Sequence, residues 1–294
     1  EEVTEDLNLS GQIILVTGTT AGIGHETMRV LAMRGAHVLA TGRTVEKVIA
    51  ASDKMPGTIT PVALELTNLT SINRCTSSVL EAGLLPDTVI CNAGIYPFGD
   101  LELVRGIEKV FFANFLGHFA LINDLLPAML ERGTGKFVHV SSDSAYKQAP
   151  ACGIDFDNLC GEGKFDAGEA YGRSKLANAL FSLELAERLK GTNLTSNAVH
   201  PGSIMTNISH SAPLWVKASL SLGRFFLRTV AEGAATQVYV ASHPDADKES
   251  GCFFETCQPV DFEDTHPIRN RKLAQELWHV ATAMSQRLQA ETAV

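Results

Sequence analysis

Residues 13–24 read Ile-Ile-Leu-Val-Thr-Gly-Thr-Thr-Ala-Gly-Ile-Gly, a short apolar run followed directly by a glycine-rich turn. The apolar run is typical of a buried β-strand, and residues 24–34 after the glycines have a helical pattern. Glycines at this junction let the backbone turn sharply and approach a pyrophosphate, while the helix N-terminus offers free N–H groups and a positive dipole end. The stretch predicts a strand–turn–helix unit that binds a dinucleotide, with an ordinary tight turn as the alternative.

Outward from this unit, short apolar runs alternate with helical patterns. We expect further strands at residues 37–41, 61–66, 88–91, 136–140, 195–199 and 252–254. Helical patterns occupy residues 45–52, a stretch that ends near residue 82, and residues 107–131 and 169–189. This alternation predicts a single α/β domain over residues 1–294: a doubly wound parallel sheet of the Rossmann type with helices on both faces. Two segments, 145–168 and 203–230, break the alternation.

Composition excludes several classes of protein. The chain has 294 residues, 45% of them hydrophobic, so it can bury a substantial core. Its formal net charge is −9 and no basic run occurs, which argues against a nucleic-acid partner. No apolar run is long enough to span a bilayer. None of the six cysteines forms a Cys-x-x-Cys pair or a zinc-spaced cluster, so we expect reduced thiols and no metal.

The same features suggest where the protein works. Reduced thiols and the lack of a visible signal peptide predict a cytoplasmic location, or at least a reducing compartment. The sequence begins at Glu1 rather than Met, so a preceding segment could have been removed. We expect membrane association if that segment was an anchor.

The end of the expected strand at residues 37–41 indicates which dinucleotide binds. An acidic residue there would bind the ribose 2′-hydroxyl of NAD. The sequence instead continues Thr41-Gly42-Arg43-Thr44, with no carboxylate. The guanidinium of Arg43 suits a 2′-phosphate, which predicts NADP(H) as the cofactor. A solvated arginine at a helix start is the alternative.

Tyr171 and Lys175 lie four residues apart in a helical stretch, and therefore on one face of the helix. A tyrosine phenol has an ordinary pKa near 10, too high for proton transfer at neutral pH. We expect the lysine ammonium to favour the phenolate and to lower that pKa. Such a tyrosine can donate a proton to a carbonyl oxygen that receives hydride, or accept one from an alcohol.

Several further motifs follow the glycine-rich turn in a fixed order. They are Asn92-Ala93-Gly94, Asn114, Ser141-Ser142, Tyr171-x-x-x-Lys175 and Pro201-Gly202, each after or within an expected strand or helix. In this combination the chain resembles the short-chain dehydrogenase/reductase family over roughly residues 8–290.

The resemblance implies a role for each matching residue. Tyr171 is the general acid/base, Lys175 holds the nicotinamide ribose and lowers the tyrosine pKa, Ser142 hydrogen-bonds the substrate oxygen, and Asn114 holds a water in a proton relay. Ser141 is the less favoured alternative to Ser142. The implied cofactor-binding residues are Gly18, Thr20, Gly22, Ile23, Gly24, Arg43, Glu65, Asn92, Ala93, Gly94, Tyr171, Lys175, Pro201, Gly202, Ile204 and Thr206.

The chain departs from the common family pattern in two places, and the second indicates a branch of the family. The family usually has Asp near the end of the third strand for the adenine amine, whereas this chain has Glu65. The 145–168 insertion separates the serine from the tyrosine. That insertion, with residues 114–119, 170–178, 200–202 and 276–278, resembles the retinol dehydrogenase-like branch, which implies retinal-, steroid- or lipid-like carbonyl or alcohol substrates.

Residues 203–230 are expected to form a lid over the substrate. They include apolar residues at helical spacing with basic residues between them over 212–230. A peripheral contact with a membrane surface through 212–230, or a subunit contact in a homo-oligomer, is the alternative.

Three functions are compatible with these residues and motifs. The first is hydride transfer between NADP(H) and a hydrophobic carbonyl or alcohol. The second is NADPH-dependent reduction of a carbon–carbon double bond. The third is an NADP(H)-sensing or scaffold protein without turnover. An α/β-hydrolase is excluded because the sequence has no Gly-x-Ser-x-Gly motif.

Overall fold

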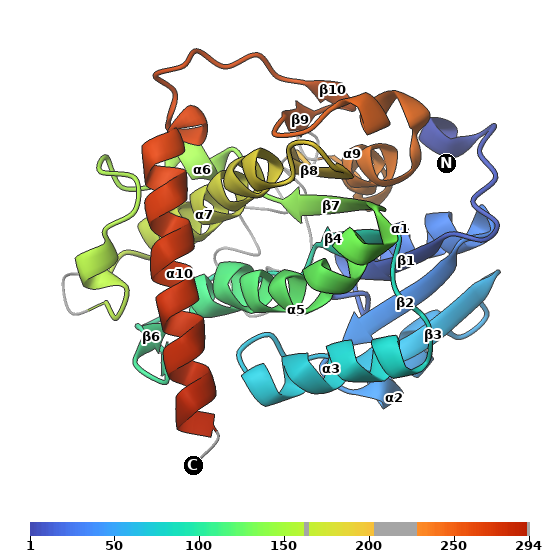
Figure 1. Ribbon diagram of the computed structural model, residues 1–294, viewed down its shortest axis with the longest axis horizontal. Helices are drawn as coiled ribbons and strands as arrows, with labels where there is room; N and C mark the ends of the chain where they lie inside the picture. The colour runs from blue at the N-terminus through green and yellow to red at the C-terminus, as the bar shows by residue number, and fades with distance from the viewer. Residues whose placement is uncertain (162–164, 203–227, 293–294) are drawn as a thin grey trace.

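An eight-stranded sheet runs through the centre of the molecule (Figure 1). The computed structural model describes residues 1–161, 165–202 and 228–292. The strand order is β10-β9-β8-β7-β4-β1-β2-β3, and every pair is parallel except β9 with β10. The strands are β1 (Ile13–Val16), β2 (His37–Gly42), β3 (Thr58–Ala63), β4 (Thr88–Cys91), β7 (Thr134–Val140), β8 (Asn193–His200), β9 (Phe253–Glu255) and β10 (Gln258–Pro259).

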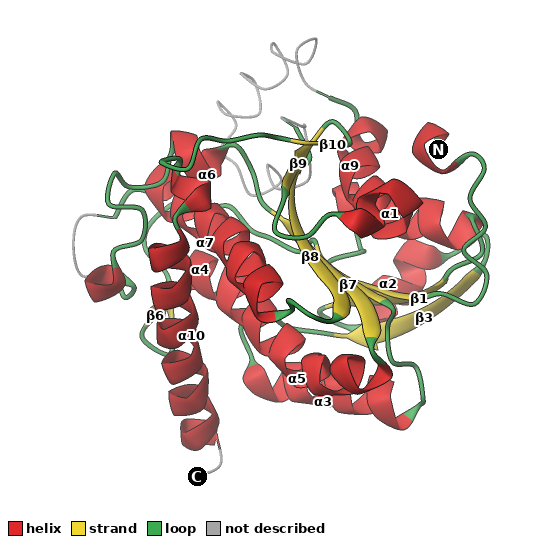
Figure 2. Cartoon of the chain, turned by 45° about the horizontal axis from the view of Figure 1, so that its top comes forward, coloured by secondary structure: helices red, strands yellow, loops and turns green. Residues whose placement is uncertain are grey.

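Helices cover both faces of this sheet (Figure 2). One face is covered by α1 (Gly22–Met33), α2 (Val45–Ser52) and α9 (Val230–Ser242). The other face is covered by α3 (Leu69–Glu81), α5 (Gly117–Arg132) and α7 (Ala167–Arg188). The strand order reverses between β1 and β4, so the carboxyl ends of these strands meet at the switch point where such folds bind ligands. The predicted doubly wound α/β fold is confirmed.

All seven strands expected from the sequence are present, and the largest error in their bounds is at β3. The sequence pattern placed this strand at residues 61–66, whereas it spans Thr58–Ala63. β3 is the edge strand, and its ladder begins where His37 of β2 pairs with Thr58. Edge strands tolerate polar residues, so a search for apolar residues alone misplaces them.

The prediction of a single regular helix over residues 107–131 is wrong. Ile107–Glu108 form strand β6, which pairs with β5 (Leu103–Val104). Helix α4 (Lys109–Phe111) then passes into a π-helical turn, Phe112–Leu116, before α5 begins. The turn contains one residue more than an α-helical turn, because the N–H of Gly117 bonds the carbonyl of Phe112.

Two long helices were not expected from the sequence pattern, α9 and α10 (Arg271–Thr292). Helix α10 crosses outside α5 and α7, as Figure 1 shows. Its Trp278 lies edge-on to Phe119 of α5 at 5.1 Å between centroids and contacts Phe181 of α7 at 5.7 Å. The guanidinium of Arg188 lies 4.2 Å from the centre of the indole ring. This aromatic contact closes the outer side of the core.

Two of the remaining short elements lie in the first segment that broke the alternation, and the others lie elsewhere. Residues 145–168 contribute the end of α6 (Ser144–Lys147) and a 3-10 turn, Phe156–Asn158. Further 3-10 turns are Glu2–Thr4, Pro244–Lys248 and Pro267–Arg269.

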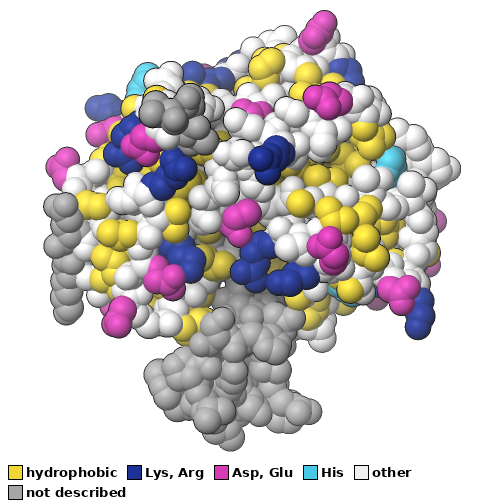
Figure 3. All heavy atoms as spheres, turned by 90° about the horizontal axis from the view of Figure 1, so that it is seen from below, with side chains coloured by type: hydrophobic (Ala, Val, Ile, Leu, Met, Phe, Trp, Pro, Cys, Tyr) yellow, Lys and Arg dark blue, Asp and Glu magenta, His cyan; other side chains and the backbone are white. Residues whose placement is uncertain are grey.

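On the face in Figure 3, basic and acidic side chains are interspersed, without a continuous basic area. All six cysteines are free thiols. Within the part of the chain that the structure describes, no cluster of three metal-ligating side chains occurs.

One described helical segment, Lys109–Arg132, is long and apolar enough to cross a membrane by length and composition, with a mean hydropathy of 1.3. Its most apolar window is 78% buried inside the fold. The apolar character of this segment is therefore accounted for by the core.

Candidate active site

The glycine-rich turn between β1 and α1 is packed too closely for any other residue at two positions. A Cβ on Gly24 would collide with the carbonyl oxygen of Gly18 and the side-chain nitrogen of Asn92. Gly18 has φ +72°, and a Cβ there would lie 2.9 Å from that of Ala93. Helix α1 begins without a side-chain cap, since its N-cap residue is Ala21. Its first N–H groups and the bare glycine backbone fit a pyrophosphate at this end of the helix.

Asn92 joins this turn to the neighbouring strand and to a residue that the sequence pattern did not indicate. Its side-chain N–H₂ group donates to the carbonyl of Thr17 at 2.8 Å, and its oxygen accepts from Gln237 Nε2 at 3.1 Å. Gln237 also donates to Thr27 Oγ1 of α1 at 2.5 Å. Gln237 lies on α9, 145 residues away along the chain, so no local pattern could have indicated it.

Arg43 and Glu65 follow the ends of β2 and β3. Arg43 is exposed and directly precedes Thr44, whose side chain caps α2. Glu65 Oε1 accepts hydrogen bonds from the N–H and hydroxyl of Thr67, at 3.2 and 2.9 Å. One carboxylate oxygen of Glu65 is therefore already engaged within its own loop.

Asn114 lies in the π-helical turn and is fully buried. Its side chain makes a paired contact with the backbone of Ile95: Oδ1 accepts from the N–H at 2.7 Å and Nδ2 donates to the carbonyl at 2.9 Å. Nδ2 also donates to Ser174 Oγ at 3.0 Å. The extra residue of the π turn brings this amide to the loop that follows β4, and π turns of this kind are often found at functional sites.

Tyr171 and Lys175 lie on the first turns of α7, as the spacing predicted. Lys175 is 3% exposed, its Nζ donates to the carbonyl of Val140 at 3.0 Å, and it lies 5.5 Å from the centre of the Tyr171 ring. Burial lowers the pKa of Lys175 to about 8. Asn178, one turn farther on, donates to the same carbonyl at 3.1 Å.

The two serines after β7 have different environments. Ser141 is buried, and its hydroxyl donates to the backbone carbonyl of Lys175 at 2.7 Å, which is a structural bond. Ser142 is partly exposed, and its hydroxyl lies 3.1 Å from Asp143 Oδ1 and 3.2 Å from Ser144 Oγ. Ser142 is therefore the more accessible of the two serines.

Comparisons with known proteins agree with this arrangement. The model of the short chain dehydrogenase family matches residues 12–154. Human retinol dehydrogenase 14 is 33% identical over 298 residues, which cover 94% of this chain and 87% of the human protein.

The chain belongs to the short-chain dehydrogenase/reductase family.

Its relatives place it in the retinol dehydrogenase-like branch of that family of oxidoreductases. A chloroplastic short-chain dehydrogenase, TIC 32 A of Brassica napus, is 35% identical over 95% of this chain and 90% of its own length. The crystal structure of an uncharacterized protein from Mycobacterium Paratuberculosis superposes with a TM-score of 0.77, at 29% identity over 97% of both chains. The family uses NAD or NADP. The closely packed glycine-rich turn between β1 and α1 fits such a dinucleotide.

The remaining family motif follows β8. Pro201 is buried, and Gly202 has φ +87°, with the position of its absent Cβ 2.5 Å from Arg228 Cδ. Ile204, Thr206 and nearly all of the expected lid, 203–230, lie outside the described residues. Their assigned roles stay predictions.

The pKa of Tyr171 in this short-chain dehydrogenase differs from the expectation. In the chain alone, the pKa of Tyr171 is raised above its usual value, first by burial and then by the negative charge of Asp143 and by Tyr96. The expectation of a lowered pKa is therefore not met in the chain alone, because burial, the largest cause, disfavours the phenolate.

Aromatic side chains beside the tyrosine form a second feature that was not expected from the sequence. Tyr96 lies 5.0 Å from Tyr171 and 4.8 Å from Phe98, measured between ring centroids. Both Tyr96 and Phe98 are partly exposed. They follow the Asn92-Ala93-Gly94 motif directly, so the apolar side chains after that motif were the available signal.

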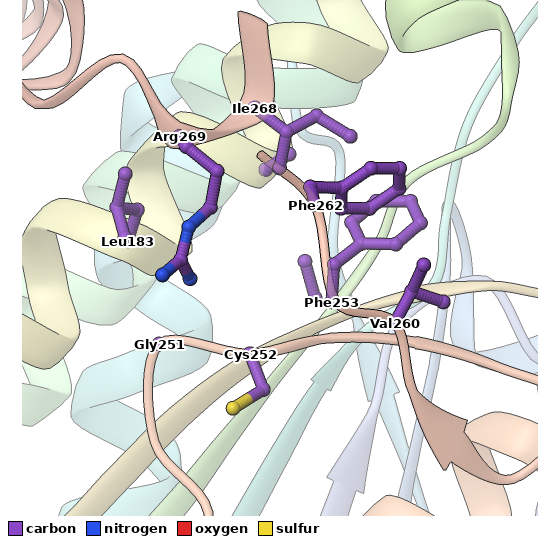
Figure 4. A pocket seen from close by; sticks show the side chains of 10 residues that line it. Leu183, Gly251, Cys252, Phe253, Val260, Phe262, Ile268 and Arg269 are labelled. Carbon is purple, nitrogen blue, oxygen red and sulfur yellow. The ribbon is translucent and has the colours of Figure 1, made fainter. Parts of the chain in front are cut away.

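A small cavity lies elsewhere in the fold, between α7 and β9 (Figure 4). Its walls include Leu183, Cys252, Phe253 and Phe262, with Arg269 at one side, and its volume with the adjoining solvent is about 260 Å³. None of the family's motif residues lines it. It is therefore separate from Tyr171, Lys175, Ser142 and Asn114.

Gly172 lets α6 approach α7, and this contact sets the position of the segment that begins at Ser142. A Cβ on Gly172 would collide with the backbone nitrogen of Ala149 and lie 2.6 Å from the carbonyl carbon of Gln148. We predict that Gly172→Ala lowers the free energy of unfolding in urea by about 1–3 kcal/mol, because the backbone must move. The control is Gly168→Ala on the same helix, where the nearest contact would be Asp166 Oδ1 at 3.2 Å. Equal stability of the two variants would contradict the prediction.

Asp143 raises the pKa of Tyr171 because a nearby negative charge disfavours the phenolate. We predict that Asp143→Asn lowers this pKa, although burial keeps it above the usual value. The measurement is the absorbance of phenolate against pH, with the titration of a Tyr171→Phe protein subtracted in each background. Asp264→Asn, an exposed carboxylate, serves as the control. An unchanged or higher midpoint in Asp143→Asn would show that the carboxylate does not act on Tyr171.

Proposed function

We propose that the protein is an NADP(H)-dependent oxidoreductase that transfers hydride between the nicotinamide and a hydrophobic carbonyl or alcohol. The observation that carries the proposal is the arrangement at the carboxyl edge of the sheet. Lys175 Nζ lies 5.5 Å from the centre of the Tyr171 ring and bonds Val140 at the end of β7, Asn114 bonds Ser174 on the same helix, and Ser142 follows β7 two residues after Val140. The glycine turn that fits a dinucleotide lies at the same edge, and Asn92 bonds it to the end of β4.

The proposed roles follow from the environment of each side chain. Tyr171 has a raised pKa, so its phenol is protonated at neutral pH and can donate a proton to a carbonyl oxygen. Ser142 steadies that oxygen through its hydroxyl. Lys175, fixed by Val140, orients the ribose and the phenol. The bound nicotinamide supplies the hydride, or accepts it when an alcohol is oxidised.

The surroundings of Tyr171 favour an apolar substrate. Tyr96 and Phe98 place two aromatic rings beside the phenol. A retinol dehydrogenase is among the relatives that cover nearly the whole chain. We therefore infer a retinal-, steroid- or lipid-like aldehyde or ketone as the substrate class.

NADP(H) is the proposed form of the cofactor. Arg43 is an exposed guanidinium just after β2, and the sequence there holds no carboxylate that would repel a 2′-phosphate. Cofactor-binding residues taken from the family motifs complete the proposed site.

The experiment that tests the function is the initial rate of NADPH oxidation with retinal, steroid ketones and medium-chain aldehydes. We expect turnover with NADPH and its loss, by about 100-fold or more, in Tyr171→Phe, because general acid catalysis contributes about 10²–10⁴ to the rate. Turnover on an enone without alcohol product would favour double-bond reduction. NADPH binding without turnover on any compound would favour a sensor or scaffold.

Arg43 gives a separate prediction on cofactor choice. Arg43→Ala is expected to raise the KM for NADPH about 10- to 100-fold, the value of a charge-assisted hydrogen bond, and to leave the KM for NADH nearly unchanged. Arg74→Ala, an exposed arginine on α3, is the control. A parallel change with both cofactors would rule out recognition of the 2′-phosphate by Arg43.

A further inference from the structure

His118 is a fully buried histidine whose two ring nitrogens contact two different parts of the active site. Nε2 lies 2.9 Å from the hydroxyl of Thr17, at the start of the glycine-rich turn. Nδ1 lies 2.9 Å from the backbone carbonyl of Asn114, in the π-helical turn. The ring therefore bridges the end of β1 and the beginning of α5, which are 101 residues apart along the chain.

On the side of the glycine turn, the hydroxyl of Thr17 is a hydrogen-bonding centre. It accepts from the backbone N–H groups of Asn92 and Ala93, both at 2.9 Å. Its own proton can then be donated to Nε2 of His118, which satisfies the hydroxyl completely. The partner at Nδ1 is a carbonyl, so the network assigns the proton of the ring to Nδ1.

On the side of the π turn, Asn114 holds the next part of the same loop. Its side-chain amide makes two hydrogen bonds to the backbone of Ile95. The segment from Asn92 to Ile95 is thus fixed at its beginning by Thr17 and at its end by Asn114. His118 connects these two anchors.

This bridge requires a neutral ring. Burial lowers the pKa of His118 to about 4, and the nearby charge of Lys175 acts in the same direction. The ring is therefore neutral over the physiological range, so Nε2 keeps its lone pair for Thr17.

We propose that His118 is a positioning residue that sets the dinucleotide turn in register with Asn114 and the catalytic group. It contacts neither substrate nor cofactor and acts through Thr17 and Asn114. The part of the proposal that concerns turnover rests on the proposed function, whereas the part that concerns the turn does not.

Two substitutions test the hydrogen bonds of His118 to Thr17 and to Asn114 separately. In His118→Asn, the amide nitrogen takes the place of Nδ1, which keeps the bond to Asn114 and removes that to Thr17. In His118→Gln, the amide oxygen takes the place of Nε2 and accepts from the Thr17 hydroxyl, which keeps that bond and removes the one to Asn114. The measurements are the Kd for NADPH by calorimetry, kcat and KM on the best carbonyl of the panel, and the free energy of unfolding in urea.

We expect His118→Asn to raise the Kd for NADPH about three- to tenfold, the value of one hydrogen bond. His118→Gln is expected to leave that Kd within about twofold and to lower kcat by about three- to tenfold, with KM for the carbonyl unchanged. In a double-mutant cycle, His118→Asn should add little to Thr17→Val, because both remove the same bond.

The chain offers a matched control in His139. This histidine is also buried, and its Nε2 lies 3.1 Å from Ser196 Oγ in the core between β7 and β8. Burial likewise lowers its pKa, to about 3. His139→Asn and His139→Gln should reduce stability to a similar degree while leaving the Kd for NADPH and kcat unchanged.

The outcomes separate this proposal from the proposed function. If NADPH binds but no carbonyl turns over, the proposed function fails. The Kd for NADPH of the His118 variants still tests the role of His118 in positioning the turn. If the His118 and His139 variants lose stability equally and none alters NADPH binding or kcat, His118 is an ordinary core residue and the proposal is overturned.

Discussion

The carbonyl of Val140 at the end of β7 is the point on which the proposed catalytic arrangement depends. It accepts hydrogen bonds from Lys175 Nζ at 3.0 Å and Asn178 Nδ2 at 3.1 Å, one turn apart on α7. The next residue, Ser141, returns a bond to the backbone carbonyl of Lys175 at 2.7 Å. These three bonds join the helix that carries Tyr171 to the strand end that carries Ser142. Because all three are buried, breaking any one would leave an unpaired polar group at a cost of about 1–3 kcal/mol.

The dinucleotide end of the site is held by contacts of a different kind. Gly24 and Gly18 allow backbone and side-chain atoms to approach where a Cβ would not fit. Asn92 then bonds the turn to β4, and Gln237 bonds Asn92 to α9 and α1. Glycine leaves the backbone of this turn conformationally free, so the hydrogen bonds of Asn92 and Gln237 restrict its movement.

Burial dominates the pKa values of Tyr171 and Lys175. It lowers the pKa of Lys175 to about 8 and raises that of Tyr171, since the charged form of each is poorly solvated. Asp143 adds to the effect on the tyrosine and is itself held by Lys147 at 2.8 Å. In the chain alone, the phenol is therefore protonated, the form that a proton donor requires.

The sequence by itself determined the fold class, the order of the strands along the chain and the motifs of the site. These depend on local patterns: apolar runs, a glycine turn after a strand, and two residues four apart on a helix. Only the tertiary structure decided the π turn at Asn114, the partners His118 and Gln237, and the raised pKa of Tyr171. Each of these depends on groups that are distant in sequence, such as Thr17 with His118 or Asn92 with Gln237, or on the solvent that folding removes. A local pattern records neither, because hydrogen bonds and desolvation between distant segments exist only once the chain has folded.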